Sequence, residues 1–126
     1  MTSKELLDFI SGIDGASCDC PFDGDFETTV FRHTDTKRWF GLYLYAPVKN
    51  VKDGITFSLP NGVKEVEVVN FKTPPELSIL LRENYKSLLP AYHMNKTHWN
   101  TVILGGDVPD CELKNLLKLS FDLTRK

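Results

Sequence analysis

The sequence has few cysteines, no long apolar run and no large excess of either charge, and each absence excludes a class of protein. Three cysteines at positions 18, 20 and 111 are too sparse for a disulfide framework, which favours a reducing, cytoplasmic setting. No stretch reaches the ~20 apolar residues of a membrane span, and the opening MTSKELLDF lacks the apolar run of a secretory signal. We therefore expect a cytoplasmic chain without a membrane partner.

Charge is unevenly distributed along the chain, although the formal net charge is only −2. Residues 14–29 contain five acidic residues and no lysine or arginine, whereas residues 30–52 hold five basic residues against Asp35 alone. Residues 84–106 carry two lysines and no acid. The whole molecule is therefore not an obvious polyanion binder, but local basic patches can hold a nucleic-acid backbone.

Helical patterns lie at both ends of the chain, whose 126 residues fit a single domain over 1–126. A capping box at Thr2 and Glu5 begins a helix over 3–13. Thr73 is the expected cap of a second helix that ends near residue 85, and Pro109 begins a third. Their apolar stripes are Leu6, Phe9, Ile10 and Ile13, then Leu77, Leu80 and Leu81, then Leu113, Leu116, Leu117 and Phe121.

Strand patterns fill the middle of the chain. Residues 27–33 and 38–46 form an expected hairpin around a polar turn, and residues 55–59 and 63–71 flank the turn signal Pro-Asn-Gly. A fifth strand is expected at 99–104, and the polar run DGASCDCPFDGD is expected to be an exposed loop. These patterns predict an α+β fold, an antiparallel sheet of about five strands with the N-terminal and C-terminal helices packed on one face.

The stretch PAYHMNKTHWNT, residues 90–101, is acid-free and rich in polar and aromatic side chains. Lys96 can contact a phosphate, and the amides of Asn95 and Asn100 can contact a phosphate or a base edge. The rings of Tyr92 and Trp99 can stack on a base. The alternative is structural, with the tryptophan in the core and the histidines and amides tying down an irregular turn. Solvent exposure decides between the two.

Lys37 and Arg38 lie at the tip of the first expected hairpin, with Arg32 across from them. A basic hairpin tip is one way in which a sheet protein holds a nucleic-acid backbone. The alternative is an ordinary solvated turn.

Metal and enzyme chemistry find little support in the sequence. His93 and His98 are five residues apart and Cys18-x-Cys20 is too short for typical zinc spacing, so we expect no metal or cofactor. A cysteine nucleophile with either histidine can be drawn, but no nucleophile signature surrounds it. The acidic residues 19–27 do not have the spacing of a calcium loop. We therefore expect a protein that is not an enzyme.

The stretch HMNKTHWNT, residues 93–101, resembles the signature of the MmcQ/YjbR family of small bacterial proteins. The resemblance extends to CPFDGDFETTVFRH, RWFGLY, FKTPPELSILLRENY and LGGDVPDCELKNLLKLSFDL, and so covers about residues 20–124. One departure is the segment 46–69, which is longer than the family's usual link between these strands. The resemblance implies a fold similar to the frataxin-like (CyaY-like) α/β sandwich. It also implies a DNA-binding role, through likeness to a double-wing transcription-factor domain.

The first hypothesis for function is a non-enzymatic, cytoplasmic DNA-binding module. The residues expected to face the phosphate backbone are His93, Asn95, Lys96, His98, Asn100, Arg38 and Lys37. The second hypothesis is a small-ligand or protein-interaction module, which the acidic 19–27 loop favours. One contiguous positive face supports the first hypothesis, and a concave apolar pocket beside His93 and Trp99 supports the second.

Overall fold

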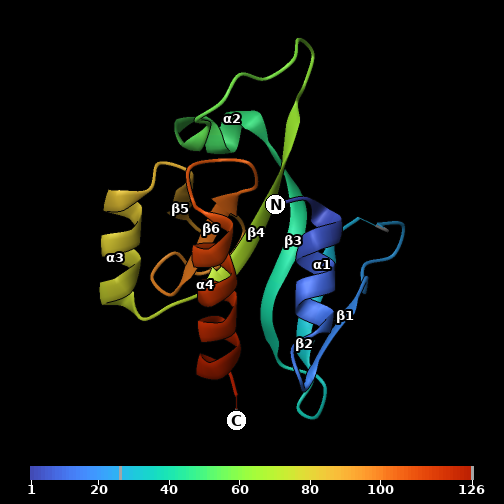
Figure 1. The fold of residues 1–126 in the computed structure, drawn as a ribbon. Helices are drawn as coiled ribbons and strands as arrows, with labels where there is room; N and C mark the ends of the chain where they lie inside the picture. The colour runs from blue at the N-terminus through green and yellow to red at the C-terminus, as the bar shows by residue number, and fades with distance from the viewer. Residues whose placement is uncertain (26, 126) are drawn as a thin grey trace.

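Six antiparallel strands form one sheet in a computed structural model that describes residues 1–25 and 27–125 (Figure 1). The strands lie in the order β1-β2-β3-β4-β6-β5. They are β1 (Ala16–Asp19), β2 (Thr29–His33), β3 (Trp39–Pro47), β4 (Glu65–Lys72), β5 (Leu88–Pro90) and β6 (Trp99–Ile103). The α+β fold is confirmed, with six strands in place of about five.

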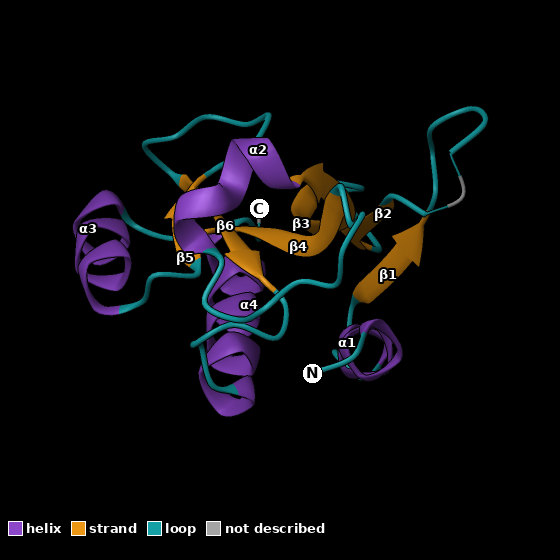
Figure 2. Ribbon diagram, turned by 90° about the horizontal axis from the view of Figure 1, so that it is seen from above, coloured by secondary structure: helices purple, strands orange, loops and turns teal. Residues whose placement is uncertain are grey.

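The terminal helices cover one face of this sheet, as expected. Figure 2 shows α1 (Ser3–Ser11) and α4 (Asp110–Leu123) below the sheet and α2 (Val48–Val51) above it. The predicted capping box of α1 is present, with Glu5 N–H donating to Thr2 Oγ1. The apolar stripes of both helices join one core cluster with Phe31, Phe40 and Phe71 of the sheet.

The opposite face of the sheet holds a second apolar cluster, and this face positions the site described below. Leu42 and Leu44 of β3 lie there with Val68 of β4. The cover is thinner than on the helical face. It includes α2, the short 3-10 turn η1 (Lys52–Gly54) with the segment 55–59 that follows it, and the loop between β5 and β6, which contributes Tyr92 and Met94.

Three segments have a structure that the sequence patterns did not predict. Residues 16–19, expected in a loop, pair with β2 as β1, and residues 88–90 pair with β6 as β5. The expected strand at 55–59 is absent, because β4 is paired on both sides, with β3 and with β6, and offers 55–59 no edge to join. Short edge strands are defined by their partners more than by their own alternation, so their patterns are weak.

The helix α3 (Pro75–Asn84) begins and faces differently from the prediction. Its N-cap is Pro74, and Thr73 instead bonds through Oγ1 to Ser78 Oγ at 2.6 Å. Leu80, expected in the core, is 55% exposed, while Ser78 is buried. Polar pairing beneath the helix therefore fixes which side faces the sheet.

Candidate nucleic-acid interface

The loop of residues 91–98 joins β5 to β6 and contains most of the predicted contact residues. Its ends close through Ala91 N–H donating to Trp99 O at 3.2 Å and Trp99 N–H donating to Asn95 O at 2.9 Å. Asn95 Oδ1 accepts from the N–H groups of Thr97 and His98. His93 takes a positive φ of 66°, a left-handed conformation in which His and Asn are enriched among non-glycine residues. The loop is thus a tight, self-bonded turn.

Arg82 of α3 holds this loop from one side. Its Nε donates to Asn100 Oδ1 at 3.0 Å, and its Nη2 donates to Lys96 O at 2.7 Å and Trp99 O at 3.1 Å. A guanidinium carries five N–H donors in a fixed fork, so one side chain can hold three acceptors at once. This contact fixes the backbone that carries Lys96.

A ring of three hydrogen bonds holds the loop from the sheet. Thr101 Oγ1 donates to Asn70 Oδ1 at 2.6 Å, Asn70 Nδ2 donates to Tyr92 O at 2.9 Å, and Tyr92 N–H donates to Thr101 Oγ1 at 2.8 Å. Asn70 and Thr101 are buried. Because these groups satisfy one another, the position of Tyr92 over the sheet is fixed by β4 and β6.

The predicted contact residues of this stretch divide into two groups. His93, Asn95, Lys96 and His98 are exposed. Lys96 Nζ donates one hydrogen bond to Ala91 O at 2.6 Å, which leaves two ammonium protons for an anion. Asn100 is 0% exposed, and its Nδ2 donates to Thr73 Oγ1 and Ser78 Oγ. Assigning Asn100 to nucleic acid was therefore wrong, because it is an internal brace.

Lys96 shares a pocket of about 390 Å³ with two further lysines, Lys49 of α2 and Lys52 of η1. All three side chains are exposed, and the acid at this pocket is Asp53. Among the described residues no ion pair involves Lys49 or Lys52. We call this pocket, with its three lysines, the lysine groove. The basic segment 30–52 is visible in the sequence, but the groove could not be predicted from it, because only the fold brings α2 beside the 91–98 loop.

The two predicted residues of the β2–β3 turn stand apart from the lysine groove. Lys37 and Arg38 are exposed, and neither lines the pocket of Lys96. The turn between β2 and β3 lies at the lower end of the molecule in Figure 1. Arg32 is already engaged, with its Nε 2.6 Å from Asp19 Oδ1 and its guanidinium 5.6 Å from the centre of the Trp39 ring. Lys37 and Arg38 are thus a separate basic tip.

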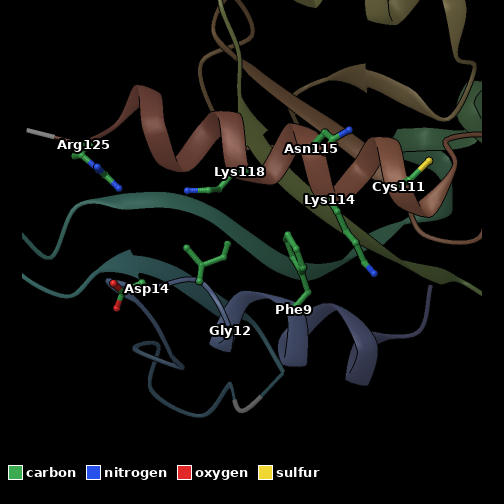
Figure 3. A pocket seen from close by; sticks show the side chains of 9 residues that line it. Phe9, Gly12, Asp14, Cys111, Lys114, Asn115, Lys118 and Arg125 are labelled. Atoms are coloured by element: carbon green, nitrogen blue, oxygen red, sulfur yellow. The ribbon is translucent and has the colours of Figure 1, made fainter.

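A second basic pocket, of about 570 Å³, lies between α1 and α4 (Figure 3). Lys114, Lys118 and Arg125 line it. Asp122 lies 3.6 Å from Lys118 Nζ and 4.0 Å from the Arg125 guanidinium, which partly offsets both charges. Asp14 adds a further acid to the lining. This pocket is therefore a weaker anion site than the lysine groove.

An apolar pocket of about 340 Å³ adjoins the 91–98 loop on the face opposite α1 and α4. A concave apolar pocket beside His93 and Trp99 was the feature that would favour a small-ligand module, and the structure has an apolar pocket beside His93 and Trp39. Its lining is Phe22, Asp25, Thr28, Trp39, Leu42, Leu44, Asn70, Tyr92, His93 and Met94. We name it the aromatic pocket.

The described residues contain no cluster of three or more side chains suited to a metal ion. Nor is any helix in the described part of the chain long and apolar enough to cross a bilayer. Burial in β1, with the neighbouring Asp19 and Cys20, raises the pKa of the Cys18 thiol to about 11. A thiol of such high pKa is a poor nucleophile at neutral pH.

We expect iodoacetamide at pH 8 to alkylate Cys18 far more slowly than the exposed Cys111. A pKa about two units above the ordinary value reduces the thiolate about 100-fold. Timed alkylation followed by peptide mass spectrometry measures the rates, and denaturation in urea should make them alike. Equal rates in the folded protein would contradict this prediction.

Comparison with known proteins places this geometry in a family. The YjbR family profile matches residues 12–123, which is most of the chain. The chain belongs to the YjbR family. Bacillus subtilis YyaQ, named as an uncharacterized protein, is 34% identical over 125 residues and covers 99% of both chains. Escherichia coli K12 YjbR, also named as uncharacterized, is 45% identical over 69 residues, which are 55% of this chain and 58% of that protein.

Solved structures of relatives share the YjbR-family fold. A crystal structure of a Pseudomonas syringae protein matches with a TM-score of 0.83 and 35% identity, covering 99% of this chain and 100% of that one. A Deinococcus radiodurans protein matches with a TM-score of 0.71 and 30% identity, covering 97% of this chain and 77% of that one. The resemblance of the HMNKTHWNT signature to this family is confirmed.

Proposed function

We propose that this YjbR-family protein binds DNA through the phosphate backbone, with the lysine groove as the contact surface. The observation that carries the proposal is the convergence of Lys49, Lys52 and Lys96 on one pocket that holds a single acid, Asp53. Phosphate contacts by lysine supply most of the sequence-independent affinity for nucleic acid. Because the net charge of the chain is −2, the protein as a whole does not attract DNA, and binding depends on where the positive side chains are gathered.

The braced loop supports the proposal by holding Lys96 in place. Its ammonium is anchored by Ala91 O, and its backbone carbonyl by Arg82. A cation held in position loses less conformational freedom when it binds a phosphate. His93 and His98, exposed on the same loop, and the basic tip of Lys37 and Arg38 are secondary contacts in this proposal.

The test replaces Lys49 and Lys52, whose side chains form no hydrogen bond with the described part of the chain. At 20 mM salt, Lys49→Glu/Lys52→Glu should bind a fluorescein-labelled duplex at least about 10-fold more weakly than wild type, measured by anisotropy. Two lost phosphate contacts should also reduce the slope of log K against log salt by about two. The basic pocket between α1 and α4 provides the matched control, Lys114→Glu/Lys118→Glu, which changes the net charge equally.

Equal losses in both double variants would mean that total charge, and not the lysine groove, governs binding. Absence of any binding by the wild type at 20 mM salt would refute DNA binding altogether. Circular dichroism confirms that each variant is folded. The alternative function, a small-ligand module without nucleic-acid binding, is favoured by the aromatic pocket and predicts that wild type does not bind the duplex at 20 mM salt.

A further inference from the structure

The aromatic pocket carries rings from two separate segments. Phe22, from the loop before β2, contacts Trp39 at the start of β3 edge-to-face, with ring centroids 6.2 Å apart. Tyr92 and His93 of the 91–98 loop form a second pair, with centroids 3.8 Å apart. Because β4 lies between β3 and β6 in the sheet, the two pairs flank the pocket, with Asn70 of β4 between them. A flat apolar group fits between such rings.

The floor of the aromatic pocket is apolar and its rim carries hydrogen-bonding groups. Leu42 and Leu44 are almost fully buried beneath it. Asp25 at the rim accepts hydrogen bonds from Thr28 Oγ1, Thr28 N–H and Glu27 N–H, which hold the pKa of its carboxyl below the ordinary value. This carboxylate repels a phosphate, but its oxygens can accept N–H groups from the edge of a base.

The aromatic pocket and the lysine groove are neighbours, because Tyr92 lines both. Their chemistries are complementary parts of one nucleotide. The aromatic pocket offers rings and an anionic rim, which suit a base, and the lysine groove offers three cations, which suit phosphates. Proteins that bind single strands combine these two features, a charged track for the backbone and rings on which bases stack.

We propose that this protein prefers single-stranded to duplex DNA, holding one unpaired base in the aromatic pocket beside Trp39 and Tyr92 while Lys49, Lys52 and Lys96 hold adjacent phosphates. The inference rests on the proposed function and adds the form of nucleic acid to it. A base within a duplex is stacked on both faces and paired along one edge, and it cannot enter such a pocket without being extruded. Stacking of one base corresponds to an affinity difference of about 10-fold.

The experiment compares three labelled 12-mers of DNA by anisotropy at 20 mM salt. They are a single strand of mixed sequence, its duplex, and a backbone of equal length in which every sugar is abasic. We expect wild type to bind the single strand about 10-fold more tightly than either of the other two. Trp39→Ala and Tyr92→Ala should remove this preference and retain the weak, salt-dependent binding of the duplex. Phe57→Ala, an exposed aromatic residue outside the aromatic pocket, is the matched control and should keep the preference.

A spectroscopic readout reports the base itself. In a Trp99→Phe background Trp39 is the remaining tryptophan of the chain's two, and its fluorescence should fall on adding the single strand but not the abasic backbone. Equal binding of all three 12-mers with no quenching overturns the inference and leaves the proposed function intact. Absence of binding to any 12-mer overturns both. Quenching by free nucleosides without binding to any 12-mer overturns both in favour of a small-ligand module.

Discussion

Replacing Gly41 with alanine is expected to lower the free energy of unfolding by about 3 kcal/mol, the upper part of the range for overpacked cores. A Cβ at this position lies 2.9 Å from Asn70 O and 2.9 Å from Phe31 Cδ2. Gly41 sits where β2 and β3 shift register beside Phe31. Neither neighbour can retreat easily, because Phe31 is 0% exposed and Asn70 belongs to β4, which is paired on both sides.

Urea denaturation followed by circular dichroism measures this loss. Gly12→Ala is the matched control, because its added Cβ meets its closest neighbour, Phe9 O, at 3.4 Å and its φ is −83°. That variant should stay within about 0.5 kcal/mol of wild type. If Gly41→Ala were as stable as Gly12→Ala, the backbone at the β2–β3 register shift would have to move to accommodate the added Cβ without loss of stability.

Replacing Arg82 with methionine is expected to lower the free energy of unfolding by about 2 kcal/mol, through loss of three hydrogen bonds donated by one charged group. Asn100 Oδ1 is left without its donor in the core, the carbonyl of Lys96 loses the donor from Arg82, and the carbonyl of Trp99 keeps only the N–H of Ala91. Because the variant releases the 91–98 loop, it should also weaken DNA binding. Amide hydrogen exchange should quicken in this loop more than in α4.

Arg82→Lys separates charge from geometry. A single ammonium cannot reproduce the fork that reaches three acceptors, so lysine should restore less than half of the lost stability. Arg38→Met is the stability control, since Arg38 is exposed and its side chain forms no hydrogen bond or ion pair with the described residues. Full recovery by lysine would mean that the positive charge, not the three-way contact, stabilises the loop.

The parts of the fold set by local pattern could be predicted from the sequence. The stripe of α4 lies within one helix, and so does that of α1 apart from Ile13, because α1 ends at Ser11 and not at the predicted residue 13. The hairpin of β2 and β3 is joined by a short turn. The strand β1 was not predicted, because it is defined by its pairing with β2. Residues 16–19 do not show the alternation of apolar and polar residues that is typical of a strand. The expected helix cap at Thr73 failed because Ser78 and Asn100 compete for that hydroxyl.

The candidate site was predicted only in part, for a similar reason. The exposure of His93, Asn95, Lys96 and His98 agrees with a surface, yet Asn100, only two residues from His98, is buried. Strand β6 begins between them and turns Asn100 toward Arg82. Lys96 lines one pocket with Lys49 and Lys52, and Tyr92 lines another with Trp39. In both pockets the residues come from segments far apart in the chain. The spacing of residues within one segment cannot predict which distant segments will line the same pocket.

The two edges of the sheet have a consequence for self-assembly. The edge strands β1 and β5 contain only four and three residues, and β5 ends at Pro90, which lacks a backbone N–H. An incoming strand from another copy would find too few unpaired backbone groups to extend a ladder. Short edges therefore disfavour fibril growth by strand addition, and the longest strands, β3 and β4, lie in the centre of the sheet, away from both edges.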